Sequence, residues 1–482
     1  MNHSHASKFV SVLALALLGC TAVGPDPEPP QADLPAAWRD SDQLPARPAE
    51  LERWWERLDD PVLDALVERA LGEGLDVRAA LARVREARAL RGVSAADRYP
   101  TVDAFGVYEH REESVTTPFG PFAPETDIHT LGFDATWEVD LWGRVRRSVE
   151  AADADLAANI EDARDVAVVV AAETARTYVE LRAFQRRVEI ALTNVSLQEQ
   201  TLELVSAREG AGLVGQRDVA QAATNVEYTR SRVPALEVGL RAAENRLAVL
   251  LGRAPGALPE ELARALAEPQ PVPRAPLEFA VGVPADVLRR RADVRAAERR
   301  LAAEIARVGV AEGDLLPRLS LFGSLGLSSN GAADLFESDS VFSGFGPSLR
   351  WNVFDGGRLR NRVRAQDARS EQALVAWEGA VLVALEEAEN AMTGFVREQV
   401  RRASLGLAAE QARLAVELAQ TEYEAGLTDF QAVLASERAL ADLEDELAVS
   451  DSTVTTRMVA LCKALGGGFE HEPLAAAVAR AD

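Results

Sequence analysis

The amino-acid sequence predicts a mainly α-helical chain of two tandem repeats, each with two β-strands and one very long helix. Three observations support this fold class. Short motifs of the first half recur in the same order in the second half. No Gly or Pro interrupts the chain between Arg144 and Glu209, so a single helix can run through it. Two segments of each half alternate apolar and polar residues over about ten positions. Such alternation, with a period of two residues, is typical of a strand.

The composition excludes several classes of function. The 482 residues allow about three domains, and their net charge is −24, from 52 basic and 76 acidic residues. Nucleic-acid binding needs clustered Lys and Arg, so we expect no nucleic-acid partner. The two cysteines and five scattered histidines lack metal-ligand spacing. A secreted enzyme remains an alternative, but no set of catalytic residues is present, so we expect no enzyme, metal or cofactor.

The first residues predict export rather than structure. Residues 1–19, with Lys8 before a short apolar run, are typical of a signal peptide. Leu17-Leu18-Gly19-Cys20 resembles a bacterial lipobox, in which Cys20 is acylated (for example by palmitate) and becomes the new N-terminus. The alternative is a signal peptide that merely contains a cysteine. Residues 20–55 then form a lipidated, proline-rich extended leash.

The repeats set the domain organisation. Asp76-Val77-Arg78-Ala79-Ala80 recurs as Asp293-Val294-Arg295-Ala296-Ala297, and Gly143-Arg144 recurs as Gly357-Arg358. The two motifs lie three positions closer together in the second copy, and such a difference in length is expected in a loop. We assign a first repeat at 56–270, a linker at 271–284, a second repeat at 285–468 and a C-terminal tail at 469–482.

Each repeat predicts the same elements in order. First comes one helix, near 61–97 and near 286–314. Two strands follow, near 101–109 and from Leu131 in the first half, and near 318–328 and 345–353 in the second. Ten alternating residues suffice for a tilted strand to cross a membrane, although a soluble sheet is the alternative. Trp137 and Trp351 fall late in their strands, where an aromatic belt is expected.

The long helices are expected at 144–209 and 358–424. Their apolar residues step by three and four positions, which is typical of a coiled-coil seam. At about 1.5 Å per residue, each helix is roughly 95 Å long. An Ala-Gly-Leu motif, at 211–213 and at 425–427, breaks each long helix, and a shorter helix returns after it. Four strands cannot close a barrel, so strands in a membrane require several copies of the chain. Two copies supply eight strands and three supply twelve. We therefore predict a membrane pore joined to a long helical duct.

Several motifs resemble the outer-membrane efflux proteins, the TolC/OprM-like outer-membrane factors, and especially their NodT-type lipoprotein branch. The motifs are Cys20 to Asp26, Trp54-Trp55, Trp137 to Arg144, Val283 to Glu298, Trp351 to Arg358 and Lys463 to Gly468. The resemblance implies a homotrimer with a shared twelve-stranded β-barrel and an α-barrel in the periplasm. It implies the outer membrane of a Gram-negative-type bacterium, a periplasmic adaptor (membrane fusion) protein and an inner-membrane pump, commonly of the RND type. The expected function is a passive exit duct of a tripartite efflux or export system.

The resemblance also points to the far end of the helices as a gate. Gly212 and Gly426 mark the two turns, because glycine permits a left-handed helix cap. Asp218 and Tyr423 match residues that the family uses to close this end.

One gate position departs from the family pattern, because Ala435 stands where an Asp is usual. Asp429 or Glu437 could supply the constriction charge, or both could be helix-start or surface acids. The alternative function for the whole chain is that of a structural coiled-coil lipoprotein without a pore. The transported substrate, the particular pump and adaptor, and the resting state of the tip are left open by the sequence.

Overall fold

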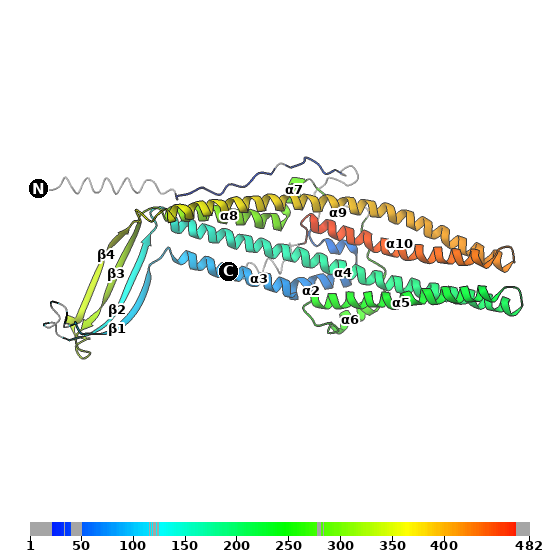
Figure 1. Ribbon diagram of the computed structural model, residues 1–482, viewed down its shortest axis with the longest axis horizontal. Coiled ribbons are helices and arrows are strands. Elements are labelled where there is room, and N and C mark those ends of the chain that lie inside the picture. Colours follow the sequence, from blue (N-terminus) through cyan, green and yellow to red (C-terminus); the bar gives the residue numbers. More distant parts are fainter. Residues whose placement is uncertain are drawn as a thin grey trace. The chain divides into compact units, whose positions relative to one another are not determined.

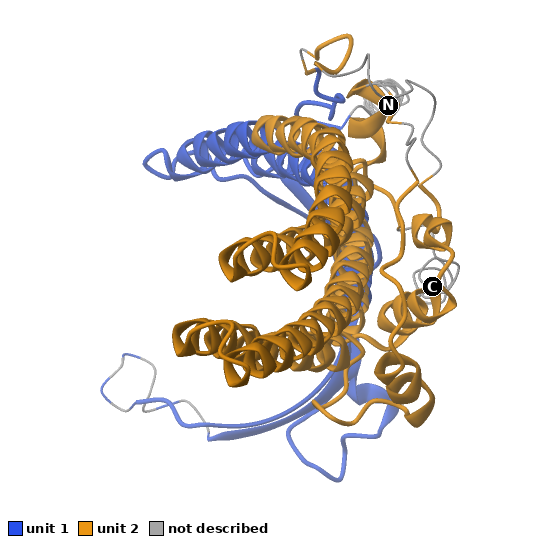
Figure 2. Ribbon diagram, turned by 90° about the vertical axis from the view of Figure 1, so that its right-hand side faces the viewer, with its two compact units in different colours: residues 1–31, 85–158, 297–377 blue, residues 32–84, 159–296, 378–482 orange. Residues whose placement is uncertain are grey.

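The computed structural model describes residues 22–32, 34–39, 51–114, 116, 118, 122, 125–276, 281–282 and 284–468. The predicted signal peptide, Cys20 and the C-terminal tail lie outside these residues. The chain forms two compact units (Figure 2). The sheet unit comprises 1–31, 85–158 and 297–377, and the helical unit comprises 32–84, 159–296 and 378–482.

Helices dominate the fold, as predicted (Figure 1). They are α2 (Pro61–Glu73), α3 (Leu75–Ala96), α4 (Arg144–Gly210), α5 (Gln216–Leu250), α6 (Glu260–Ala267), α7 (Pro284–Arg290), α8 (Ala292–Gly313), α9 (Arg358–Glu424) and α10 (Phe430–Ala464). The predicted bounds of the two long helices are correct to within one residue. Each has 67 residues, or about 100 Å at 1.5 Å per residue.

The tandem repeat is visible in the lengths of the elements. Helices α4 and α9 are both 67 residues long, and α5 and α10 are both 35. Helices α3 and α8 are both 22 residues long. The difference in length between the copies falls between the strands, because the loop 112–125 of the first pair is longer than the loop 330–340 of the second. The repeat therefore keeps the lengths of these three helix pairs, whereas α2 and α7 differ, with 13 and 7 residues.

The prediction of one unbroken helix before the strands is wrong in both halves. In the first half the chain breaks at Gly74, where a Cβ atom would lie 2.3 Å from the Ala70 carbonyl oxygen and 3.1 Å from that of Leu250. In the second half it breaks at Arg291, whose buried guanidinium donates to Asp293 and Glu387 at 2.6 and 2.7 Å. Glycine disfavours a helix at the first break, and contacts with Leu250 and Glu387 add a tertiary element at the two breaks.

The strands form one antiparallel sheet in the order β1-β2-β3-β4. Their bounds are Thr101–Arg111, Thr126–Val139, Arg318–Ser329 and Val341–Arg350. Trp137 lies in β2 as expected, but Trp351 lies just beyond the end of β4. Strands β1 and β4 each pair on one side only within the described part of the chain.

The helical unit has a continuous apolar core around Trp54, Trp55 and the buried thiol of Cys462. A fully buried Arg182 on α4 contributes a polar clamp to this core. It donates to the carbonyl oxygens of Ala265 and Glu268, at 3.0 and 2.7 Å. These contacts satisfy the orphan carbonyls at the end of α6 and hold that short helix against α4.

Candidate functional site

The sheet has one apolar and one polar face. Successive side chains of a strand point to opposite faces, so the register assigns them. One face is mostly apolar and carries Val102, Ala104, Tyr108, Leu131, Phe133, Ala135, Trp137, Leu319, Leu321, Leu325, Leu327, Phe345 and Leu349. Near the loops of the two strand pairs it also carries His110, Asp127, His129, Ser329 and Ser343. The other face is mostly polar and carries Thr101, Asp103, Phe105, Thr130, Asp134, Thr136, Ser320, Phe322, Ser324, Ser328, Phe342, Gly344 and Ser348, together with Val107 and Ile128.

The apolar face has no cover within the described part of the chain. Phe133 is 59% exposed, Leu325 57% and Phe345 92%. A soluble subunit seldom exposes a continuous apolar patch of this size. The face therefore suits hydrocarbon, and the polar face suits a water-filled side.

Three tryptophans lie at the end of the sheet where the strands meet the helices. The indole nitrogens of Trp137, Trp142 and Trp351 donate to the carbonyl oxygens of Arg98, Pro317 and Leu315, at 3.0, 2.8 and 3.0 Å. Trp142 is 42% exposed and Trp351 57%. An indole with a tethered N–H and an exposed ring suits a membrane–water interface. We call Trp137, Trp142 and Trp351 the tryptophan girdle. The sequence analysis did not single out Trp142 as one of its members.

The described helices themselves offer no bilayer crossing, since none is both long enough and apolar enough.

Two similar turns lie where the long helices end, one between α4 and α5 and the other between α9 and α10. Gly212 and Gly426 adopt φ of 73° and 75°. The amide of Leu213 donates to the Arg208 carbonyl at 2.9 Å, and that of Leu427 to the Glu422 carbonyl at 2.8 Å. These bonds form a Schellman cap, which needs a left-handed residue. Leu213 and Leu427 are 67% and 80% exposed, so each turn presents an apolar side chain to solvent.

Tyr423 is the centre of a small cluster below these turns. The residue is only 3% exposed, and its ring packs against Phe430, with centroids 5.8 Å apart. The Arg208 guanidinium carbon lies 4.4 Å from the ring centroid, and Arg208 Nη1 donates to the Tyr423 carbonyl oxygen at 2.6 Å. Burial, and then the charge of Asp218, raise the pKa of the Tyr423 phenol. The cluster thus joins the ends of α4 and α9 through a charged hydrogen bond and a cation–π contact.

Asp218, Asp429 and Glu437 occupy different environments. Asp218 lies in the first turn of α5. Asp429 is exposed and caps α10, because its carboxylate accepts from the Ala432 amide at 3.2 Å. Glu437 is 2% exposed and accepts from Thr201 Oγ1 at 2.6 Å and from Gln420 Nε2 at 3.4 Å. Asp429 therefore caps the start of α10, whereas Glu437 links α4, α9 and α10 through its hydrogen bonds.

A Glu437→Gln variant is expected to gain stability over the wild type as pH rises. Burial raises the pKa of Glu437 above its ordinary value of 4.5, so the folded state holds the proton more tightly than the unfolded state. The wild type then loses stability as pH rises from the ordinary value through the raised pKa. Thermal unfolding of both proteins from acidic to neutral pH measures this. Glu417→Gln, on an exposed position of α9, is the control, and a pH-independent difference for Glu437→Gln contradicts the prediction.

Arg208 and Thr201 are tip residues that the sequence analysis missed. Each lies on the uninterrupted helix α4, among many other polar side chains. Their partners Tyr423 and Glu437 lie 215 and 236 residues away. No local spacing links residues so far apart, so only the fold reveals the contacts.

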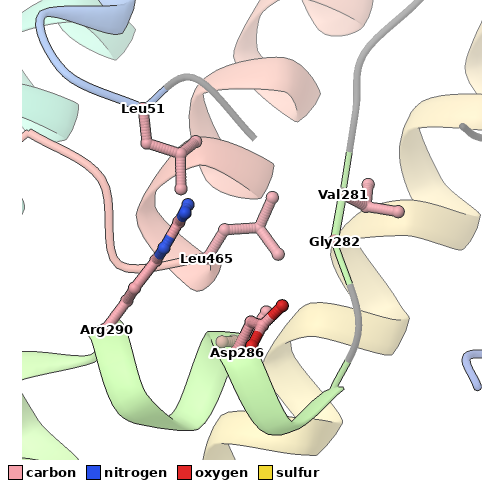
Figure 3. Close-up of a pocket in the computed structure, with 7 residues that line it drawn as sticks. Leu51, Val281, Gly282, Asp286, Arg290 and Leu465 are labelled. Atoms are coloured by element: carbon pink, nitrogen blue, oxygen red, sulfur yellow. The ribbon is translucent and has the colours of Figure 1, made fainter. Parts of the chain in front are cut away.

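Neither cavity in the helical unit contains a catalytic arrangement among the described residues. One cavity of about 10 Å³ is lined by Leu51, Val281, Gly282, Asp286, Val287, Arg290 and Leu465 (Figure 3). It has room for about one water molecule. A groove of about 1340 Å³ lies among α4, α9, α10 and residues 269–275. In the same part of the chain, no three His, Cys, Asp or Glu side chains are grouped to hold a metal.

Comparison with known proteins agrees with this geometry. The family model described as outer membrane efflux protein matches residues 66–253 and 283–467. The chain is 32% identical to the pyoverdine export outer membrane protein OpmQ of Pseudomonas putida, over 95% of this chain and 97% of that protein. It is 30% identical to nodulation protein T of Rhizobium leguminosarum bv. viciae, over 96% and 94% of the two chains. The solved outer-membrane channel OprN has a TM-score of 0.87 and 36% identity, over 93% of this chain and all of that one.

Proposed function

The chain belongs to the outer membrane efflux protein family, and from that premise we propose that it is the lipid-anchored, trimeric exit duct of an RND-type pump. Its relatives are outer-membrane efflux channels of tripartite systems, and so is this chain. It resides in the outer membrane with its helical part in the periplasm. Family members form homotrimers and act with adaptor proteins and inner-membrane pumps. RND coupling, outer-membrane lipid as a partner and the acylated Cys20 are the proposed refinements.

The half-paired sheet supports a closed ring of several copies, and the family indicates three of them. Strands β1 and β4 leave 11- and 10-residue edges without partners within the described chain. Unpaired backbone groups are costly in hydrocarbon. If β4 of one copy pairs with β1 of the next, three copies of the four-stranded sheet close a twelve-stranded barrel. The apolar face then meets lipid and the polar face lines the lumen.

The tip cluster supports a gate at the periplasmic end. We assign the closing contacts to Tyr423 and Asp218, with Arg208 holding Tyr423 in place. Asp429 is exposed and so is available as the constriction charge, whereas Glu437 contributes through packing beneath it. The exposed Leu213 and Leu427 suit contact with an apolar groove on an adaptor. Transport through such a duct is passive, and we infer that the chain catalyses no reaction and needs no metal or cofactor.

Single-channel conductance together with oligomer mass tests the proposed function. The detergent-purified protein is expected to have three times the mass of the acylated chain. In planar bilayers it is expected to give small, cation-preferring channels that are mostly closed. The cation preference follows from the carboxylates of the polar face and the tip. A monomer without conductance would overturn the proposal and favour the structural lipoprotein without a pore.

A further inference from the structure

We propose that the sheet unit contains a slot for the chain's own segment Ala22–Asp26, and that this slot fixes where the acylated N-terminus enters the membrane. The slot is formed by Gly143, by Arg147 on the first turn of α4 and by Gly309 on α8. Its second role rests on the proposed acylation of Cys20. All the contacts that form it lie within the sheet unit.

Arg147 holds the segment through three acceptors. Its Nε donates to the Val23 carbonyl oxygen at 3.1 Å, and its Nη2 to the Gly24 carbonyl oxygen at 3.1 Å. Nη2 also contacts the Asp26 carboxylate at 2.6 Å. The Arg147 side chain is only 4% exposed, so its bonds to the two carbonyl oxygens are sheltered from water, whereas the Asp26 carboxylate is 86% exposed. A fourth contact does not involve Arg147. In it, the Val23 amide donates to the Trp142 carbonyl oxygen at 2.9 Å.

Three glycines let the two backbones meet. A Cβ atom on Gly309 would lie 2.7 Å from the Val23 carbonyl oxygen and 2.9 Å from Arg147 Cγ. One on Gly24, which has φ +92°, would lie 2.4 Å from Gly309 Cα. One on Gly143 would lie 2.6 Å from Ala22 Cβ. Gly309 weakens its helix by about 1 kcal/mol relative to Ala, so the close approach gives it a reason to be there.

The other copy of these positions lacks the slot. The repeat relates Gly309 to Gly92 and Arg147 to Asn361. A Cβ atom on Gly92 would meet nothing within 4 Å in the subunit, and one on Gly357, the counterpart of Gly143, would meet only Asn361 Nδ2 at 4.0 Å. The slot therefore does not follow from the packing of the repeat. It occurs only where the N-terminal segment is received.

The position of the slot places the lipid at the tryptophan girdle. Cys20 precedes Ala22 by two positions, so at 3.8 Å per step its Cα lies within about 8 Å of that residue. Ala22 touches Gly143, and Val23 is bonded to Trp142. Trp142 is one of the three tryptophans at the end of the sheet where the strands meet the helices. Acyl chains on Cys20 thus start at the level where the strands enter the bilayer.

A nitroxide label tests the slot directly. Glu28→Cys provides an exposed labelling site, while Cys462 is fully buried and Cys20 is expected to be acylated. In the labelled, purified trimer, Gly309→Ala and Arg147→Ala are each expected to turn a restricted spectrum into a mobile one. Proteolysis of the leash is expected to accelerate at least tenfold. Gly92→Ala and Glu150→Ala are the matched controls, because Gly92 has an open Cβ position and Glu150 binds Arg147 outside the slot.

The same samples separate the slot from the proposed function. Mass spectrometry reports acylation of Cys20, and conductance of assembled trimers is expected to be unchanged in Gly309→Ala. The amount of trimer in the outer membrane is expected to fall at least threefold in that variant. An unchanged spectrum in Gly309→Ala would overturn the slot. A mobile spectrum with a normal amount of outer-membrane trimer would overturn its role in placing the anchor.

Discussion

A Leu325→Arg substitution is expected to eliminate the trimer from the outer membrane. Leu325 lies in the interior of β3 on the apolar face, directly opposite Phe133 in β2. An arginine facing lipid near the bilayer midplane costs about 2–4 kcal/mol in a membrane barrel, and a trimer carries this cost three times. Membrane fractionation with an oligomer-specific gel measures the assembled fraction.

The neighbouring residue supplies the control. Ser324 is on the polar face, opposite Asp134 and Gly344. Ser324→Arg adds the same side chain to the same strand, where Asp134 can neutralise its charge. It is expected to assemble normally and to reduce the cation preference of the channel. Equal amounts of trimer for the two variants would show that the two faces of the sheet are assigned wrongly.

An Arg208→Ala substitution is expected to open the periplasmic tip. It removes the hydrogen bond to the Tyr423 carbonyl oxygen and the stacking on the Tyr423 ring. A hydrogen bond to a charged group contributes about 1.5–3 kcal/mol and a cation–π contact about 0.5–1 kcal/mol. If these contacts belong to the closed tip, its population should fall more than tenfold relative to the open one. Single-channel recordings would then show a higher open probability.

Arg217→Ala is the matched control for this prediction. Arg217 lies near the same turn, in the first turn of α5, but it is exposed. Its loss changes the charge of the tip by the same amount and is expected to leave the open probability unchanged. If Arg208→Ala and Arg217→Ala behave alike, charge alone controls the tip, and the contact with Tyr423 has no role in gating.

Much of the fold could be predicted because its signals are local. The absence of Gly and Pro defines α4, and the two turn glycines mark where each long helix ends. Alternation defines the strands and their two faces. Each of these signals depends on residues within a few positions of one another, so the sequence alone carries it.

The features that could not be predicted depend on distant partners. At the two helix breaks, Gly74 lies close to the carbonyl of Leu250, and Arg291 is bonded to Glu387. The stacking of Arg208 on Tyr423 and the N-terminal slot likewise join residues far apart in the chain. The gate candidates from the family resemblance stay predictions, and the resemblance did not indicate that Arg208 contacts Tyr423.

The equal helix lengths of the two repeats limit how the protein can change over evolution. Val205, Ala222, Ala419, Tyr423 and Phe430 belong to one apolar cluster near the turns, so both turns must reach the same level. An insertion in α4 alone would move one turn away from the other and expose this cluster. A longer duct therefore requires matched insertions in α4, α5, α9 and α10. The loop between β1 and β2 already differs in length from its counterpart between β3 and β4, so length change is tolerated at the strand loops and opposed at the tip.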